Sequence, residues 1–321
     1  MPRTPNRPPR RPDPPPRGGK RSTGPAPGKR RPPESPRDPP EDAARGPRRL
    51  EGRLQARAER REEAARAPVM DRSREMTPGG ALWLHGLHAV AAALANPRRG
   101  AKRLLLTEDA ETSLAGRLPK PWRIPAERAD RGRFATFLPE DAVHQGAALL
   151  VEPLPPVPIE EAIARRTGPV LLLDQVTDPR NVGAILRSAA AFGAACVVMQ
   201  DRHAPPETGA LARAASGALE IVPVVREVNL SRAIVALQRA GFWVLGLAGE
   251  ARRTLAEATP ADRRVALVLG AEEGGIRRLQ RETCDELVRL PISPEMESLN
   301  VAAAAAVALY EIVRQGALRD A

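Results

Sequence analysis

Hydrophobic residues follow two alternating patterns over the second half of the 321-residue chain. Short continuous apolar runs of strand length alternate with segments in which apolar residues recur every three or four positions, as on helices. The expected strands are 170–174, 196–199, 221–225, 243–246, 265–270 and 287–291. The expected helices lie near 182–193, 208–217, 230–240 and 299–314. This alternation predicts an α/β domain with a mostly parallel sheet that helices cover on both faces.

The last helical segment carries no charge from Leu299 to Tyr310. A helix that is apolar all round is expected to be buried on every side, and this one is too short to cross a bilayer. Two polar residues, Ser298 and Asn300, stand at its start. They are either helix caps or part of a binding site that opens at the helix N-terminus.

A smaller α/β pattern comes first, with a helix expected near 87–94 and strands at 103–107 and 147–151. The sequence PLPPVP at 153–158 is typical of a stiff linker. We therefore expect four parts: 1–78 as a disordered tail with a charged helical linker, 79–153 as a small α/β domain, 154–168 as a linker, and 169–321 as the larger α/β domain.

The first 78 residues carry most of the positive charge. They hold 21 Lys and Arg against 11 Asp and Glu, a net +10 of the chain's +11. Residues 1–47 contain 16 prolines and almost no large apolar side chains, so they cannot bury enough surface to offset the entropy of ordering. We expect this tail to be disordered. It is either a diffuse phosphate-binding extension or a solubilising one.

Several classes of protein are disfavoured. The N-terminus has no apolar core of a secretory signal, and no run reaches about 18 apolar residues, so we expect a cytoplasmic protein without membrane association. Cys196 and Cys284 are isolated, so we expect small buried side chains and no disulfide or zinc site. His85 and His88 lack a third ligand and are interpreted as packing or RNA contacts, with no metal.

The loop after the 170–174 strand is a candidate site element. Asp178-Pro179-Arg180-Asn181 is expected to turn into a helix with Asn181 as its N-cap. Arg187 then lies about one turn beyond Gly183, beside a bare patch of helix. The arginine either serves a site there or extends into solvent.

The loop at 268–279 (VLGAEEGGIRRL) is a second candidate. Gly270, Gly274 and Gly275 permit tight turns and close approach of a ligand to the backbone. The spacing is neither GxGxxG nor a P-loop, so a phosphate cradle is poorly supported. Glu272 and Glu273 are either site residues or simple surface carboxylates.

These two loops and the one after 287–291 follow strands of one predicted sheet, so their side chains are expected to meet at its carboxyl edge. The sequence has no Ser-His-Asp set, and its four histidines lie outside the three loops. Hydrolysis by that route is disfavoured.

Taken in order, the loops resemble the three motifs of the SpoU (TrmH) family of RNA ribose 2'-O-methyltransferases, within the SPOUT superfamily. The first motif is Asp174-x-Val176 with Asp178-Pro179-x-Asn181-x-Gly183 and Arg187, the second Gly270-x-Glu272 with Gly275, and the third Pro291 with Ser298-Leu299-Asn300-Val301. Segments 83–90, 144–146 and 215–223 resemble the bacterial subgroup that methylates guanosine riboses of 23S rRNA.

The resemblance implies a fold and a reaction. It implies a trefoil knot in the larger domain, an L30e/L7Ae-like RNA-binding domain before it, a homodimer, and S-adenosylmethionine as the methyl donor. By the same resemblance the catalytic residues are Arg187, Asn181, Glu272, Ser298 and Asn300. The cofactor-binding residues it implies are Leu269, Gly270, Ala271, Glu272, Gly275, Leu290, Ile292, Leu299 and Asn300.

The role of Arg187 has two versions. The resemblance implies that it takes the proton of the ribose hydroxyl or stabilises the developing oxyanion. A guanidinium stays protonated in ordinary settings, so the first role needs a dry site and an RNA phosphate beside it.

The chain departs from the family pattern at two loop positions. Pro294 stands where the third motif usually has Gly, and Glu273 where Gly usually follows the motif-two Glu. Proline fixes φ and removes a donor, so the shape of the cofactor loop is expected to change. Two alternatives to a 23S rRNA enzyme therefore stay open: a tRNA ribose methyltransferase, and a non-catalytic RNA-binding or ribosome-assembly factor.

Overall fold

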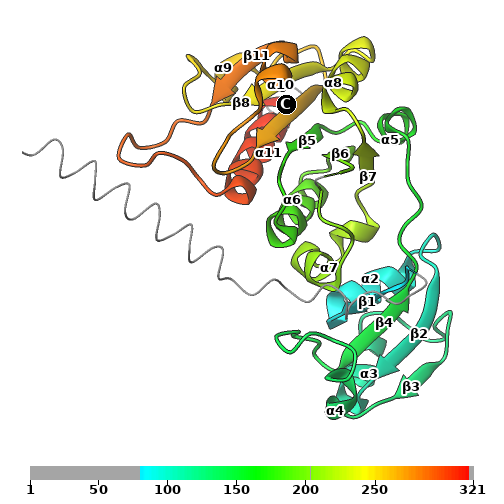
Figure 1. Ribbon diagram of the computed structural model, residues 1–321. Coiled ribbons are helices and arrows are strands. Elements are labelled where there is room, and N and C mark those ends of the chain that lie inside the picture. Colours follow the sequence, from blue (N-terminus) through cyan, green and yellow to red (C-terminus); the bar gives the residue numbers. More distant parts are fainter. Residues whose placement is uncertain (1–79, 203, 318–321) are drawn as a thin grey trace, which may run out of the picture. The chain divides into compact units, whose positions relative to one another are not determined.

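The computed structural model describes residues 80–202 and 204–317 (Figure 1). The expectations for the tail and the charged helix after it lie outside these residues. The described chain contains two sheets, one of four strands and one of seven.

The four-stranded sheet is built from the first part of the chain. Its order is β1-β4-β2-β3, with β4 antiparallel to both neighbours and β3 parallel to β2. The strands are β1 (Leu82–His85), β2 (Ala101–Leu106), β3 (Ala126–Arg128) and β4 (Ala147–Val151). The helices are α2 (Leu87–Ala95), α3 (Glu108–Ala115) and α4 (Arg131–Phe134). The predicted strand 147–151 is confirmed, as is the helix near 87–94.

The seven-stranded sheet is parallel throughout, as predicted, in the order β7-β6-β5-β10-β8-β11-β9. Its strands are β5 (Val170–Asp174), β6 (Cys196–Gln200), β7 (Val224–Glu227), β8 (Trp243–Leu247), β9 (Arg253–Thr254), β10 (Val265–Gly270) and β11 (Glu286–Arg289). The helices are α5 (Ile159–Arg165), α6 (Pro179–Ala191), α7 (Gly209–Ala215), α8 (Leu230–Arg239), α9 (Leu255–Ala258), α10 (Arg278–Thr283) and α11 (Val301–Ala317).

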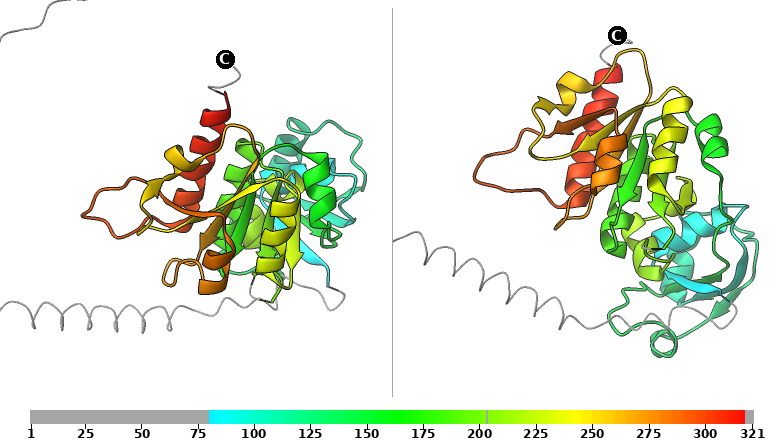
Figure 2. Two further views of the ribbon diagram at one scale, coloured as in Figure 1. Left: turned by 90° about the horizontal axis from the view of Figure 1, so that it is seen from above. Right: turned by 45° about the horizontal axis from the view of Figure 1, so that its top comes forward.

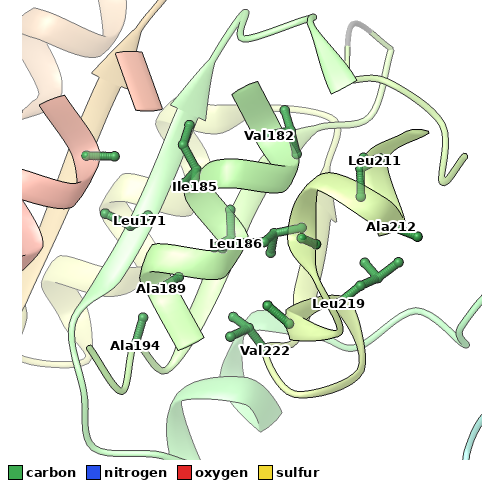
Figure 3. Close-up of a cluster of buried hydrophobic side chains, with 14 of the residues drawn as sticks. Leu171, Val182, Ile185, Leu186, Ala189, Ala194, Leu211, Ala212, Leu219 and Val222 are labelled. Carbon is green, nitrogen blue, oxygen red and sulfur yellow. The ribbon is translucent and has the colours of Figure 1, made fainter. Parts of the chain in front are cut away.

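Both faces of this sheet are buried, which explains its continuous apolar strands (Figure 2). Alternate residues of β5 point to opposite faces: Leu171 and Leu173 pack with α6, α7 and α11, whereas Val170 and Leu172 pack with α5 and α8. Figure 3 shows Leu171 facing the apolar side of α6 and, beyond it, residues of α7. Of the described helices, none has the length and apolar character needed to cross a membrane.

Five of the eight predicted strands have other bounds in the structure: 103–107, 196–199 and 243–246 differ by one or two residues, and 221–225 and 287–291 are displaced beside a proline. The strand expected at 221–225 starts at Val224, because a 3-10 turn, Ala218–Glu220, ends the preceding segment and leaves Ile221 56% exposed. Pro223 has no N–H to donate and only accepts a bond, from Val197. The strand expected at 287–291 ends at Arg289, ahead of Pro291.

The prediction that the last helix is buried on every side is wrong. Ala305, Ala308 and Leu309 of α11 are fully buried, but Val307 and Tyr310 are 48% and 54% exposed. A helix face without charged residues can be buried at little cost. The sequence of that face does not show which neighbour covers it.

The two cysteines are unpaired and lie within the larger domain. Cys196 is buried in β6, and Cys284, at the end of α10, is half-buried. Burial raises the pKa of each thiol to about 12, so both behave as small apolar side chains, as predicted.

A buried ion cluster holds Arg99 between several segments. Its guanidinium donates to Glu220 (Nη2 to Oε1 2.6 Å), to the carbonyl of Glu152 (3.0 Å) and to Glu207. The Arg99 side chain is fully buried and that of Glu220 is 4% exposed. Burial raises the pKa of Glu207 above its ordinary value, although Arg99 acts in the opposite direction.

Replacing Arg99 by methionine will leave two carboxylates without their buried cation. We expect Arg99→Met to lower the free energy of unfolding by about 3–5 kcal/mol, measured by chemical denaturation. Arg103→Met is the matched control, because its partner Glu127 and Arg103 itself are nearly half exposed, and it should cost less than about 1 kcal/mol. Equal losses in the two variants would contradict the structural role of Arg99.

Candidate functional site

Three side chains from the three candidate loops form one hydrogen-bonded group, here called the amide–carboxylate cluster: Asn181, Glu272 and Asn300. Asn300 Nδ2 donates to Glu272 Oε1 (2.7 Å) and to Asn181 Oδ1 (3.1 Å), and Asn181 Nδ2 donates to the same Glu272 oxygen (3.2 Å). The three loops therefore meet at the carboxyl edge of the sheet, as predicted.

Asn300 is both a cap and a cluster residue. Its Oδ1 accepts from the backbone N–H of Ala302 (3.0 Å) and Ala303 (3.3 Å), which satisfies the start of α11, while its Nδ2 serves the cluster. Asn300 is therefore both a helix cap, through its Oδ1, and a site residue, through its Nδ2. Glu272 Oε1 also accepts from the N–H of Val301 (3.4 Å), so a negative charge faces the positive end of the helix.

Asn181 was expected to cap α6, and this is wrong. Asp178 is the cap, since its Oδ1 accepts from Arg180 N–H (2.8 Å), and Pro179 occupies the first helical position. Asn181 is the third residue of the helix, within its first turn, and its amide is thereby available to Glu272.

An ion pair between a buried carboxylate and a partly exposed arginine fixes the second loop to the first. Asp174, at the end of β5, is fully buried and accepts from the backbone N–H of Arg277 (2.9 Å) and from its Nε (2.8 Å). The same guanidinium reaches Gln200 of β6 (3.0 Å). Arg277 was not predicted as a site residue. Its signal was indirect: a carboxylate at the end of a buried strand needs a cationic or N–H partner.

Gly270 is required by the loop itself. A Cβ at this position would lie 2.0 Å from the carbonyl carbon of Gly275, because the chain doubles back to form a bond from Gly275 N–H to the Ala271 carbonyl (2.8 Å). Gly275 adopts a left-handed φ of 61°, which favours glycine. The close approach expected for a ligand at Gly270 is therefore made by the protein's own backbone.

A cavity of about 190 Å³ opens beside the cluster. It is lined by most of the residues that the resemblance implied for the cofactor: Leu269, Gly270, Ala271, Glu272, Gly275, Leu290, Ile292 and Leu299. Ser298 also lines it, whereas Asn300 does not. Residues 247–250, the last residue of β8 and the three after it, complete the wall and were not predicted, although the rule that ligands bind beyond strand ends applied to them as well.

The chemistry of this cavity suits a nucleoside-containing cofactor. Leu247, Leu290, Ile292 and Leu299 supply apolar side chains against which a flat base can pack. Loop backbone at 270–271 and 298–299 supplies N–H and carbonyl groups, and Glu272 is the point where the cavity and the amide–carboxylate cluster meet.

Arg187 lies apart from the amide–carboxylate cluster. It is exposed on α6 and lines a second hollow of about 380 Å³ together with Arg180 and Arg213, which we call the arginine groove. The bare patch expected beside Gly183 is covered: a Cβ on Gly183 would meet the Cβ of Ala214 on α7 at 2.5 Å. His85 and His88 were both interpreted as packing or RNA contacts. His85 is buried at the edge of this groove, whereas His88 lies exposed beside Arg117.

Pro294 fits the loop that carries it. The N–H of Met296 donates to the Ser293 carbonyl (3.0 Å), so Pro294 occupies the second position of a four-residue turn. That position favours the fixed φ of proline and needs no donor. Glu273 lies exposed in the turn between Ala271 and Gly275.

The fold and the cavity at the carboxyl ends of its strands place the chain among ligand-binding α/β proteins with a doubly covered parallel sheet. Residues 168–310 match the model of the SpoU rRNA Methylase family, and residues 83–157 match the model described as RNA 2'-O ribose methyltransferase substrate binding. The chain belongs to the SpoU rRNA methylase family.

Relatives and solved structures agree with this membership. The chain is 39% identical over 72% of its length to the 23S rRNA (guanosine-2'-O-)-methyltransferase RlmB of Vibrio cholerae, and 40% identical over 72% to RlmB of Pseudomonas aeruginosa, covering 96% of each. The SpoU methyltransferase AviRb of Streptomyces viridochromogenes, solved in complex with the cofactor AdoMet, shares the fold. The TM-score is 0.63 at 23% identity, with 76% of this chain and 95% of that one covered.

The loop geometry predicts different outcomes at two neighbouring glycines. Gly270→Ala forces its new methyl into the backbone of Gly275, so the free energy of unfolding should fall by about 1–3 kcal/mol. Gly274→Ala is the control, because a Cβ there meets nothing within 4 Å, and its effect should stay within about 0.5 kcal/mol. Thermal and denaturant unfolding measure both; a neutral Gly270→Ala would contradict the loop geometry.

Proposed function

We propose that the chain transfers a methyl group from S-adenosylmethionine to the ribose 2'-oxygen of a guanosine in 23S rRNA. The observation that carries the proposal is Glu272, which belongs both to the cavity beyond the strand ends and to the amide–carboxylate cluster. The names of the curated relatives support the RNA and the nucleoside, and AdoMet in the related AviRb structure supports the donor.

The cofactor-binding residues are proposed as Leu269, Gly270, Ala271, Glu272, Gly275, Leu290, Ile292, Leu299 and Asn300. When bound, S-adenosylmethionine supplies an electrophilic methyl. The apolar side chains hold its base and exclude water, and the loop backbone orients it. Asn300 acts indirectly, by fixing the Glu272 carboxylate and the start of α11.

Asn181, Glu272, Ser298, Asn300 and Arg187 are the proposed catalytic residues. The first four orient the ribose and the cofactor, with the side chains of Asn181 and Asn300 held by Glu272. Arg187 stabilises the oxyanion that develops as the ribose hydroxyl gives up its proton to solvent water. Its guanidinium is exposed and binds no group in the described part of the chain, so it is available to a substrate.

The domain boundaries at 79–153, 154–168 and 169–321 are part of the proposal, with the first of these regions holding RNA. The match of residues 83–157 to a substrate-binding model supports that role. The cytoplasm, where ribosomal RNA is made and modified in bacteria, is the proposed location.

A homodimer is also proposed. Six of the ten large apolar side chains that are exposed in the described chain lie between 292 and 313, on α11 and the loop before it. Val307, Tyr310 and Val313 recur every three residues along α11, so they share one side of the helix, and an exposed apolar face of this kind marks a protein interface. A second copy of the chain, through the α11 face centred on Val307 and Tyr310, is the proposed partner.

Removing the Arg187 guanidinium should slow methyl transfer. We expect Arg187→Ala to lower kcat by about 10²- to 10³-fold on a 23S rRNA fragment with labelled S-adenosylmethionine, while cofactor affinity by calorimetry stays unchanged. Arg239→Ala, an exposed arginine on α8, is the control. Equal incorporation by Arg187→Ala and wild type would overturn the assignment.

The same assay tests the substrate and the class of protein. Faster labelling of bulk tRNA than of the 23S fragment would favour the tRNA enzyme. Failure of wild type to bind S-adenosylmethionine would favour a non-catalytic RNA-binding factor.

A charge on the open face of α11 should break the dimer. We expect Tyr310→Glu to convert a dimer into a monomer at micromolar concentration, measured by size exclusion with light scattering, because a carboxylate would be buried unpaired. Val228→Glu, at an apolar residue 69% exposed in another loop, should leave the dimer intact. A monomeric wild type would refute the proposal.

A further inference from the structure

The arginine groove brings together more positive charge than one catalytic arginine requires. Arg180 and Arg187 are seven residues apart on α6, which places them on the same side of the helix and about 10 Å apart along its axis. Arg213 reaches the same groove from α7. The side chains of all three are exposed.

Close packing of two helices puts Arg213 there. Gly183 of α6 lies against α7 so tightly that a Cβ would meet the Leu211 carbonyl at 2.6 Å and the Ala215 nitrogen at 2.9 Å. The absence of a side chain at Gly183 therefore sets the distance between the α6 and α7 arginines. The side chains that face the groove between them are small, Ala210 and Ala214, and leave room for a ligand.

The charges in the groove are poorly balanced by the protein. Asp141 is the one carboxylate among its described lining residues, and it lies 3.9 Å from Arg180, both side chains being about two-thirds exposed. The guanidinium groups of Arg187 and Arg213 form no hydrogen bond or ion pair within residues 80–202 and 204–317. Guanidinium groups in such a setting suit the phosphates of an RNA strand, which are bound in a planar, bidentate way.

We propose that the arginine groove binds the sugar-phosphate backbone of the RNA strand next to the target ribose, with Arg180 and Arg213 as phosphate-binding residues in the same groove as Arg187. They are positioning residues: they hold the strand so that one ribose lies at Arg187, and they carry no proton or methyl. Backbone contacts of this kind fix register without reading sequence. The inference rests on the proposed function and adds to it a surface and two residues.

The experiment measures binding of a 23S rRNA fragment to the full-length protein by fluorescence anisotropy across a range of NaCl concentrations. Arg213→Ala and Arg180→Ala should each weaken binding about 5- to 20-fold and reduce the slope of log K against log salt by about 1. Arg213→Lys should recover most of the affinity, since it restores the charge. Asp141→Asn should strengthen binding, because it removes the opposing charge.

Single-turnover and steady-state methylation separate positioning from catalysis. Arg180→Ala and Arg213→Ala should raise KM for RNA with kcat within a few-fold of wild type, whereas Arg187→Ala lowers kcat. Arg239→Ala is the control for an exposed arginine outside the groove. Unchanged melting temperature and unchanged affinity for S-adenosylmethionine would exclude a merely structural effect.

Failure of this inference can be told from failure of the proposed function. If wild type methylates the fragment but the groove variants bind it with the wild-type slope and affinity, the groove proposal is overturned and the activity stands. If wild type transfers no methyl but the groove variants lose affinity and slope, the groove is an RNA site and the proposed reaction is overturned.

Discussion

One carboxylate oxygen connects the parts of this site. Glu272 Oε1 accepts hydrogen bonds from Asn181, 91 residues away, from Asn300, 28 residues away, and from the backbone at Val301. Each donor belongs to the start of a helix that follows a strand of the parallel sheet. Removing that oxygen would leave two amides and a helix N-terminus without their common acceptor, so the loops depend on it for their relative position.

The ion pair between the buried Asp174 and the partly exposed Arg277 gives that acceptor its location. Asp174 ends a strand packed on both faces, where an unpaired carboxylate would be very costly, and Arg277 satisfies it through both backbone and side chain. The loop that contains Glu272 is thus held at its far end by a charge pair and at its near end by the Gly270–Gly275 backbone contact. The rigidity of the loop explains how an exposed Glu272 can define a site.

Helix α6 separates two kinds of chemistry. Near its start, Asn181 belongs to the cluster beside the apolar cavity, where neutral amides and a carboxylate can orient polar groups. Arg180 and Arg187 face the arginine groove, where charge is in excess. A nucleoside cofactor and a polyanionic strand need such different surroundings, and adjacent sides of one helix supply both within a short distance.

The sequence by itself determined the alternation of strands and helices, the parallel sheet, and the three loops at its edge. These follow from local periodicity and from the geometry of parallel strands, which hold whatever the neighbours are. The family motifs also pointed to nine of the residues that line the cavity, Ser298 among them. The effects of the prolines on the backbone were only partly predicted. Pro223 and Pro291 shortened the strands predicted around them, while Pro294 fitted its turn.

Only the tertiary structure decided what covers each surface. Periodicity shows that an element has an apolar face, but the partner comes from distant sequence: α7 covers Gly183, whereas Val307 and Tyr310 stay about half exposed in the described chain, with Phe192 against the Tyr310 ring. In the same way, Arg277 and residues 247–250 lie at the site because of the order of the strands in the sheet. That order cannot be predicted from a local sequence pattern. Asn181 is a cluster residue because Asp178, and not Asn181, caps α6. Which of the two residues caps the helix is decided only by the folded backbone.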